Sequence, residues 1–254
     1  MGSRYDNRVT TFSPDGKLGQ VENAMQAISQ AGSAVGIKAK DGVVLAAQKM
    51  ITSKLLDIRK TAEKMYKIDD HVAVAVAGIT ADANILINYS RLEAQRYTYA
   101  YRENIPIEQL LMRVCDLKQG YTQFGGLRPF GVSFLFAGWD EHFGFQLYQS
   151  DPAGVYNGWK AKAIGANSPA AQSIFKKEYD EDIKLDDALL LSLKVLGKTM
   201  DTTSPTPDKV EISTITRDAN GEVVYHVFSK KELEDLCDRA EPLLKAQKDA
   251  EGDM

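Results

Sequence analysis

Hydrophobic positions change their spacing several times along the chain, and each change marks a new secondary-structure element. Leu18, Val21, Met25 and Ile28 recur at three- and four-residue steps, which predicts a short amphipathic helix. Later runs of alternating or continuous apolar residues predict strands. The predicted helices cover residues 18–29, 80–101, 107–119, 168–179, 185–200 and 229–248, and the predicted strands cover residues 34–39, 43–47, 64–68, 72–77, 131–137, 145–149, 156–164, 210–216 and 223–228.

Turn and cap residues separate these elements. Asp-Gly at residues 41–42 and Asn-Gly at residues 220–221 each predict a hairpin. Pro106 suits the start of a helix, and Thr80 or Asp82 is expected to cap the helix over residues 80–101. Strands therefore come in blocks and helices in pairs. This order predicts one α+β domain in which two stacked antiparallel sheets carry helices on both outer faces.

Composition and charge narrow the classes of partner. The 254 residues carry a formal net charge of −4, whereas a nucleic-acid binder is normally basic on one face. No apolar run approaches the roughly 20 residues of a membrane span, and the first residues lack the apolar segment of a signal peptide. The two cysteines, Cys115 and Cys237, indicate buried thiols in a reducing cytosolic or nuclear compartment. We therefore expect neither nucleic acid nor a membrane as a partner.

Motifs for nucleotide, metal or serine-hydrolase chemistry do not occur in the sequence. There is no P-loop, no Gly-x-Gly-x-x-Gly and no Gly-x-Ser-x-Gly. His71, His142 and His226 have no second histidine or cysteine pair at metal-ligand spacing. We therefore expect no metal and no cofactor, and we interpret the histidines as ordinary surface or core residues.

Three longer motifs carry more information. They are the stretches over residues 5–22, Tyr-Asp-Asn-Arg-Val-Thr-Thr-Phe-Ser-Pro-Asp-Gly-Lys-Leu followed by Gln-Val-Glu; over residues 121–131, Tyr-Thr-Gln-Phe-Gly-Gly-Leu-Arg-Pro-Phe-Gly; and over residues 150–154, Ser-Asp-Pro-Ala-Gly. Together they resemble the signature of proteasome α-type subunits, over roughly residues 5–236. The stretch over residues 138–152 narrows this resemblance to one kind of α-type subunit. The resemblance divides the chain into a gating tail and turn at residues 1–17, the subunit domain at 18–236, and the end of the C-terminal helix with a frayed tail at 237–254.

The resemblance implies a four-layer αββα sandwich, the N-terminal-nucleophile hydrolase fold. It also implies a seat in the seven-membered outer α-ring of the 20S core particle, stacked on catalytic β-type subunits, in the cytoplasm and nucleus. The complex degrades unfolded proteins, with or without a ubiquitin tag. Its α-type members are structural and gating subunits, and peptide hydrolysis belongs to the β-type partners.

The positions that match the catalytic residues of β-type relatives explain why no catalysis is expected here. The nucleophilic threonine position is Gly32, which has no hydroxyl and lies behind a retained N-terminal segment. The acidic position is Gln48, and the lysine position is Lys64. With one of three residues kept, the chain is expected not to cleave peptides.

The resemblance implies a different, non-catalytic role for the lysine that is kept. In the context Glu63-Lys64-Met65-Tyr66, the resemblance implies that Lys64 lines a pocket between adjacent α subunits, with Glu22 and Gly32 nearby. The C-terminal carboxylate of a regulatory-particle ATPase or another activator would dock there. The alternative is a solvated strand lysine.

The N-terminal tail is the second implied functional element. Tyr5, Asp6 and Pro14 match three members of a cluster that fixes the open gate in the family, and Arg8 lies in the same tail. The fourth member is a tyrosine, but this chain has Asn23, and an amide supplies neither ring stacking nor a phenol hydroxyl. The alternative is a disordered terminus.

The glycine-rich loop is the third element. It follows Tyr121 and contains Gly125, Gly126, Arg128 and Pro129. The resemblance places it near the N-terminal parts of adjoining α subunits, so we expect an inter-subunit contact through the planar donor fork of Arg128. The alternative is a connecting loop without a partner.

The helices over residues 80–101 and 107–119 are the expected contact with the β-ring, and an outward second apolar stripe would distinguish this role from covering the chain's own sheet. Two other functions remain open at this point. One is an active N-terminal-nucleophile amidohydrolase, and the other is a free-standing adaptor outside any particle.

Overall fold

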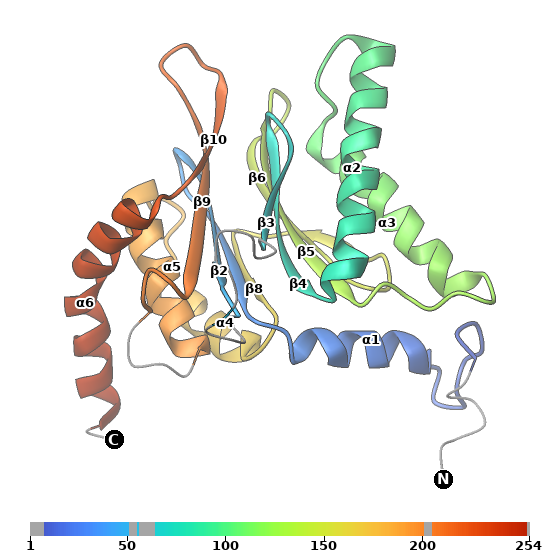
Figure 1. Cartoon of the computed structure of the whole chain (residues 1–254), viewed down its shortest axis with the longest axis horizontal. Coiled ribbons are helices and arrows are strands. Elements are labelled where there is room, and N and C mark those ends of the chain that lie inside the picture. Colours follow the sequence, from blue (N-terminus) through green and yellow to red (C-terminus); the bar gives the residue numbers. More distant parts are fainter. Residues whose placement is uncertain (1–7, 51–54, 56–63, 201–204, 253–254) are drawn as a thin grey trace.

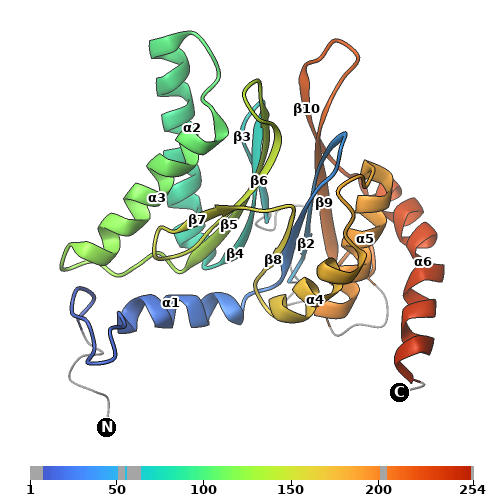
Figure 2. The same ribbon diagram turned by 180° about the vertical axis from the view of Figure 1, so that it is seen from behind.

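The computed structural model describes residues 8–50, 55, 64–200 and 205–252. In this part of the chain two five-stranded antiparallel sheets lie face to face, and helices cover the outer face of each (Figure 1). Figure 2 shows the same four layers from behind. The prediction of an α+β sandwich of αββα layers is confirmed.

The first sheet has the strand order β10-β9-β2-β1-β8. Its strands are β1 (Ala34–Lys38), β2 (Gly42–Gln48), β8 (Ala161–Ile164), β9 (Val210–Arg217) and β10 (Val223–Val227). Helices α4 (Ser168–Glu178) and α5 (Leu185–Thr199) pack on this sheet, and α6 (Lys230–Gly252) packs on α5. The helices bury a core in which Leu193, Leu196 and Ile212 are almost fully enclosed.

The second sheet has the order β3-β4-β5-β6-β7. Its strands are β3 (Met65–Asp69), β4 (Val72–Gly78), β5 (Val132–Asp140), β6 (Gly144–Ser150) and β7 (Tyr156–Gly158). Helices α2 (Thr80–Tyr101) and α3 (Ile107–Gln123) cover it, around a core that contains Leu86, Leu110 and Phe134. A third core between the two sheets includes Leu45, Ala75 and Leu135. Small residues such as Ala73 and Ala77 let the sheets approach closely.

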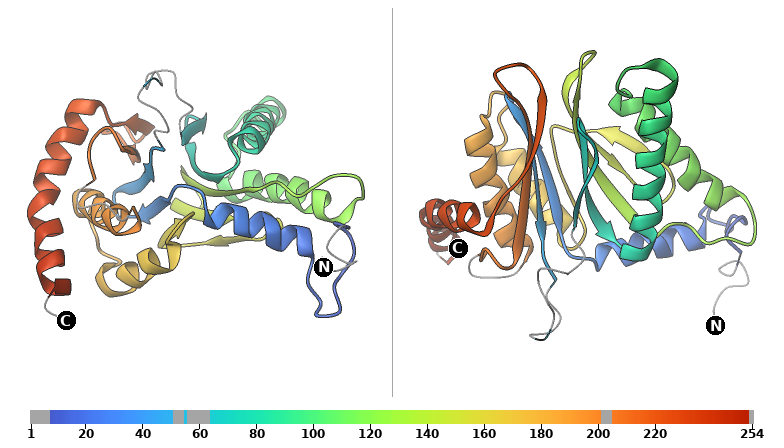
Figure 3. Two further views of the ribbon diagram at one scale, coloured as in Figure 1. Left: turned by 60° about the horizontal axis from the view of Figure 1, so that its bottom comes forward. Right: turned by 45° about the horizontal axis from the view of Figure 1, so that its top comes forward.

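Helix α1 (Gly19–Ser29) crosses one end of the sandwich (Figure 3). Its buried side chains Val21, Ala24 and Ile28 face the sheets, as the apolar spacing predicts. At the opposite end lie the α2–α3 loop and the turns of the β1–β2, β5–β6 and β9–β10 hairpins (Figure 1). The sandwich therefore has an α1 end and a hairpin end.

Three predicted boundaries of secondary-structure elements are wrong. The single strand predicted over residues 156–164 is two strands, because the chain crosses between the sheets at residues 159–160: β7 pairs with β6, and β8 pairs with β1. The helix predicted to stop at residue 119 continues to Gln123, one turn further. The C-terminal helix continues to Gly252 instead of ending at residue 248.

The predicted cap of α2 is also wrong. Ile79 is the N-cap residue and makes no side-chain cap hydrogen bond. Thr80 lies inside the helix, and the carboxylate of Asp82 bonds to Arg128 and to the amide of Gly131 instead. Of the two cysteines, Cys115 is buried as expected, but Cys237 is only partly buried.

Candidate functional site

At the α1 end, the structure brings together the three positions that match the catalytic set. Gly32 lies between α1 and β1, Gln48 ends β2, and Lys64 immediately precedes β3. The Lys64 Nζ donates to the carbonyl oxygen of Gly32 at 2.6 Å. The amide of Ser33 lies 3.4 Å from Gln48 Oε1, and the two residues also pair through their backbones.

The Lys64 ammonium sits in a partly dry position. The residue is only partly exposed. Burial lowers its pKa to about 8, while the carboxylate of Glu211 acts in the opposite direction. At pH 7 the amine therefore still carries its proton, and it is poised to bind an anion without the full hydration of a surface lysine.

Two residues of this site carry no motif in the sequence. Glu211 on β9 is 5% exposed, and its Oε2 accepts the backbone N–H of Lys64 at 3.1 Å. The signal that could have found it is one acidic residue near the start of a strand whose next five residues are apolar or small and polar. Gly165 has φ +88°, and a Cβ there would lie 2.7 Å from the Gly32 oxygen. Only glycine allows this close approach of the two chain segments.

Glu22 does not join Lys64 within this chain. It is exposed near the start of α1, and the remaining helix separates it from Gly32 by roughly 10 Å or more at 1.5 Å per residue. The expected grouping of Lys64, Glu22 and Gly32 therefore reduces, inside one chain, to Lys64 and Gly32.

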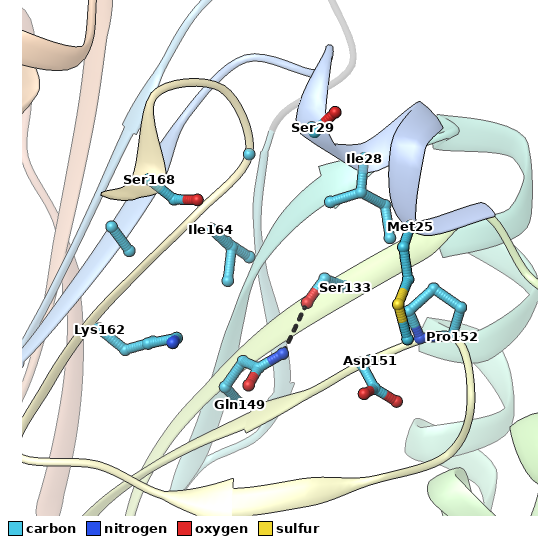
Figure 4. Close-up of a pocket in the computed structure, with 12 residues that line it drawn as sticks. Met25, Ile28, Ser29, Ser133, Gln149, Asp151, Pro152, Lys162, Ile164 and Ser168 are labelled. Carbon is cyan, nitrogen blue, oxygen red and sulfur yellow. Dashed lines mark hydrogen bonds between the residues drawn. The ribbon is translucent and has the colours of Figure 1, made fainter. Parts of the chain in front are cut away.

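A cavity of about 280 Å³ adjoins this site on the other side of Gly165. Figure 4 shows Met25, Ile28 and Ser29 of α1 above it, with Ser133 and Gln149 on the second sheet below. Lys162 also lines it, with its Nζ 3.8 Å from the centre of the Trp159 ring, and burial lowers the pKa of Lys162. Lys64 does not line this cavity.

The described part of the tail begins at residue 8. Tyr5 and Asp6 lie outside the described residues. Arg8, Pro14 and Asn23 are exposed, with Asn23 on α1. The predicted turn is present, because Gly16 has φ +74° and its amide donates to the Ser13 oxygen.

The glycine-rich loop joins α3 to β5 and lies beside the segment over residues 8–18 in every view (Figures 1–3). Tyr121 belongs to the last turn of α3 and packs on the ring of Phe130, with the ring centres 4.4 Å apart. Gly125 and Gly126 are exposed, and a Cβ on either would meet nothing within 4 Å. Pro129, in contrast, is buried.

Arg128 makes a contact that the sequence did not predict. Its Nη1 and Nη2 donate to the two oxygens of Asp82 at 2.6 and 2.9 Å. The hydrogen bond with Arg128 holds the pKa of Asp82 below its usual range against the opposing effect of burial. The donor fork expected to face a neighbouring subunit is thus bound to α2 of the same chain.

Candidate metal sites and candidate membrane-spanning helices are both absent from the described residues. No group of three or more histidine, cysteine, aspartate or glutamate side chains there could hold a metal ion. No helix in that part of the chain is long and apolar enough to cross a bilayer.

Comparison with known proteins identifies the family. Residues 28–215 match the proteasome subunit family, and residues 5–27 match the N-terminal signature of proteasome A-type subunits. The chain is 61% identical to proteasome subunit alpha type-4 of Spinacia oleracea and 62% identical to subunit alpha type-4-A of Arabidopsis thaliana, in each case over 93% of this chain and 94% of the relative. It is 60% identical to subunit alpha type-4 of Petunia hybrida over the same shares. These relatives confirm the resemblance that the three motifs predict, and the kind that the stretch over residues 138–152 resembles is α type-4. The chain therefore belongs to the proteasome subunit family, as an α-type member.

Proposed function

We propose that this chain is a non-catalytic structural and gating subunit in the outer α-ring of the 20S proteasome core particle. One observation carries the proposal: the nucleophile position is Gly32, in the middle of a continuous chain and bound through its carbonyl oxygen to Lys64. The particle degrades proteins with or without ubiquitin, in the cytoplasm and nucleus, and its β-type subunits perform the hydrolysis.

The chemistry of the site supports this division of labour. An N-terminal nucleophile needs a side-chain hydroxyl and a free α-amine that acts as its base. Gly32 offers no hydroxyl, and its nitrogen is a peptide nitrogen that continues into α1. The neighbouring Ser33 hydroxyl donates to the carbonyl oxygen of Ala166 at 2.8 Å, and Gln48 supplies no negative charge. The active amidohydrolase considered from the sequence therefore lacks its nucleophile, its base and its carboxylate at this position.

Covalent labelling tests the catalytic part of the proposal. A threonine-directed inhibitor added to the native particle should label β-type chains and leave this chain unlabelled, as measured by intact-protein mass spectrometry. An inhibitor adduct on this chain would contradict the proposal.

The Lys64 site supports a second part of the proposal, the docking of activators. A partly exposed ammonium beside the Gly32 carbonyl suits the terminal carboxylate of an extended peptide. In a pocket between two α subunits, Glu22 would come from the adjoining chain, because α1 holds the chain's own Glu22 away from Lys64. We propose the C-termini of regulatory-particle ATPases or other activators as the ligands.

The third part of the proposal is gating by the tail that includes Tyr5, Asp6 and Arg8. Phe12 is 64% exposed, and Pro14 and Asn23 are also exposed, so the described end of the tail has surface available for neighbouring chains. Deletion of residues 1–10 should raise the basal peptide hydrolysis of the assembled particle. Unchanged basal hydrolysis in a normally assembled particle would refute gating by this tail.

The loop between α3 and β5 supports contacts within the α-ring. Its apolar side chains Phe124 and Leu127 are 65% and 47% exposed. Arg128 also binds Asp82 within the chain. A loss of ring assembly in Arg128→Ala could therefore come from the lost ion pair or from a lost contact between subunits. The cleaner test is Phe124→Ser with Leu127→Ser, which should reduce ring assembly while the Arg128–Asp82 pair stays intact.

The exposed face of α2 supports a contact with the β-ring. Ile85, Leu92 and Tyr99 follow each other at seven-residue steps and are 56%, 48% and 79% exposed. Seven residues are close to two helical turns, so the three side chains form one outward stripe. A second apolar surface of this kind is what we expect of an interface helix, so the stripe supports the proposed contact.

A further inference from the structure

The hairpin end of the sandwich contains a partly open cavity, which Lys64 does not line. A cavity of about 420 Å³ lies where the α2–α3 loop meets the end of β5 and the start of β10. Its lining includes His71, Arg102, Glu103, Asp140 and Glu141. Figure 1 shows these elements at the end of the molecule opposite α1.

His71, which lines this cavity, has one buried ring nitrogen without a hydrogen-bond partner among the described residues. The side chain is 2% exposed, and its Nε2 lies 2.7 Å from the carbonyl oxygen of Ile105. A carbonyl only accepts, so Nε2 carries a hydrogen and donates it to this oxygen. Among the described residues Nδ1 has no partner. A buried polar nitrogen without a partner is costly, and proteins normally satisfy it.

The charges around the cavity favour a cationic donor. Burial alone would raise the pKa of Asp140, but hydrogen bonds from Gln146 and from the amides of Phe143, Ile107 and His142 outweigh it and hold the pKa below its usual range. Asp140 is therefore ionised at neutral pH.

Three carboxylates line the cavity against one guanidinium. The carboxylates of Glu103 and Glu141 are exposed at the mouth beside that of Asp140. The guanidinium of Arg102 already has a partner, since it lies 5.7 Å from the centre of the Tyr99 ring.

The outward stripe of α2 leads to this cavity. Tyr99, the last residue of the stripe, lies one turn before Arg102 and Glu103. Tyr101 and Phe143, which are 62% and 70% exposed, add aromatic surface in the same two segments of chain. A partner that covers the stripe therefore also reaches the mouth of the cavity, and aromatic side chains are enriched at protein interfaces.

We infer that this cavity receives an arginine or lysine side chain from the chain that packs against α2, which under the proposed function is a β-type subunit. The cationic N–H groups of that side chain would bind the carboxylates of Glu103 and Glu141, which line the cavity together with His71. The inference rests on the proposed function, because it names the chemistry by which one of the proposed partners is recognised.

The structure of the assembled particle tests the inference directly. An electron cryomicroscopy map should show a basic side chain of a partner in the cavity, with a nitrogen within about 3.2 Å of His71 Nδ1 or of a lining carboxylate. A cavity that holds only water, or one filled by an apolar or acidic side chain, would overturn the inference.

Charge reversal at the mouth provides a second test that spares the buried residues. The double variant Glu103→Lys with Glu141→Lys should lower the share of the tagged chain found in particles with β-type chains by roughly tenfold, because a basic side chain would then face like charge. Glu234→Lys, an exposed change on α6, is the matched control and should assemble normally. Equal assembly of the double variant and the control would overturn the inference. If the unaltered chain itself occurs without β-type chains, the proposed function fails instead.

Discussion

Lys64 and Lys118 are both lysines with a pKa lowered by burial to about 8, yet they are built for different tasks. Lys118 on α3 is 0% exposed, and its Nζ donates to Ser150 Oγ at 2.9 Å and to the carbonyl oxygen of Val132 at 3.2 Å. The same Nζ lies 4.8 Å from the centre of the Phe134 ring. Lys118 therefore ties α3 to the second sheet from inside the core.

Lys64 lies at the α1 end of the sandwich and is partly exposed, with its Nζ on the carbonyl of Gly32. A ligand can reach it without unfolding anything, whereas nothing can reach Lys118. The comparison teaches that a lowered lysine pKa marks burial, and that access separates a binding lysine from a structural one.

The largest effect is expected from truncation of Lys118. Lys118→Ala removes two hydrogen bonds and leaves a cavity, which should lower the free energy of unfolding by about 3 kcal/mol in a urea titration of the purified chain. Lys118→Met keeps most of the volume and removes a buried charge, so it should cost only about 1 kcal/mol. If Lys118→Ala left the free energy of unfolding unchanged, as a substitution of an exposed lysine would, the comparison would be wrong.

Lys64→Ala should have a small effect on folding and a larger one on ligand binding. Loss of the ammonium should weaken the binding of a peptide with an activator's C-terminal carboxylate to the particle by roughly tenfold. Lys67→Ala is the matched control, since Lys67 lies on β3, three residues after Lys64, and forms an exposed ion pair with Asp70. Equal binding by the two variants would show that Lys64 is not the docking lysine.

The pH dependence of stability should report both lysines. Between pH 8 and the ordinary lysine pKa of 10.5, the unfolded chain keeps protons that the folded chain has released, so stability rises with pH. Above pH 9 the two cysteines act in the opposite direction, because burial raises the pKa of Cys115 and Cys237 to about 11.

From pH 8 to pH 9 the unfolding free energy should therefore rise by on the order of 1 kcal/mol for each lysine. Lys118→Met should remove about half of this rise, and urea titrations at the two pH values measure it. A stability that falls over this interval would contradict the assignment.

The smallest effect is expected at Gly32. A Cβ there would meet Lys64 Nζ at 2.9 Å, which is the end of a flexible side chain, and Met50 Cγ at 3.1 Å, which also belongs to a flexible side chain. Gly32→Ala should thus cost less than about 1 kcal/mol in thermal unfolding. Gly165→Ala is the contrast, because its φ of +88° and the backbone oxygen 2.7 Å from the new Cβ leave no such escape. Equal melting temperatures in the two variants would show that this segment adjusts more freely than the geometry indicates.

The sequence predicted the sandwich well because period and turn residues are local signals. The hairpin at residues 41–42 and the helix over residues 80–101 depend on neighbours in sequence, and both are present. The region over residues 156–164 failed because its change of sheet is decided by distant partners: the Trp159 amide bonds to Leu147, and the Lys160 carbonyl bonds to Lys38.

The candidate site divides in the same way. Motif matching placed Gly32, Gln48 and Lys64 in one set, and the structure brings them together. It missed Glu211 and Lys118. Their partners lie far away in the sequence, so the apolar segment around each charged residue does not show whether those partners are buried with it. It also misjudged Arg128, whose partner Asp82 lies far away in the sequence and was expected to cap a helix.

The most direct test of the account is the native mass and composition of this chain, tagged at its C-terminus and purified gently from its own cells. The account predicts a particle many times the 28.1 kDa of the chain, containing α-type and β-type subunits and a peptidase activity sensitive to threonine-directed inhibitors. Elution as a single chain, as a free-standing adaptor would elute, would contradict it.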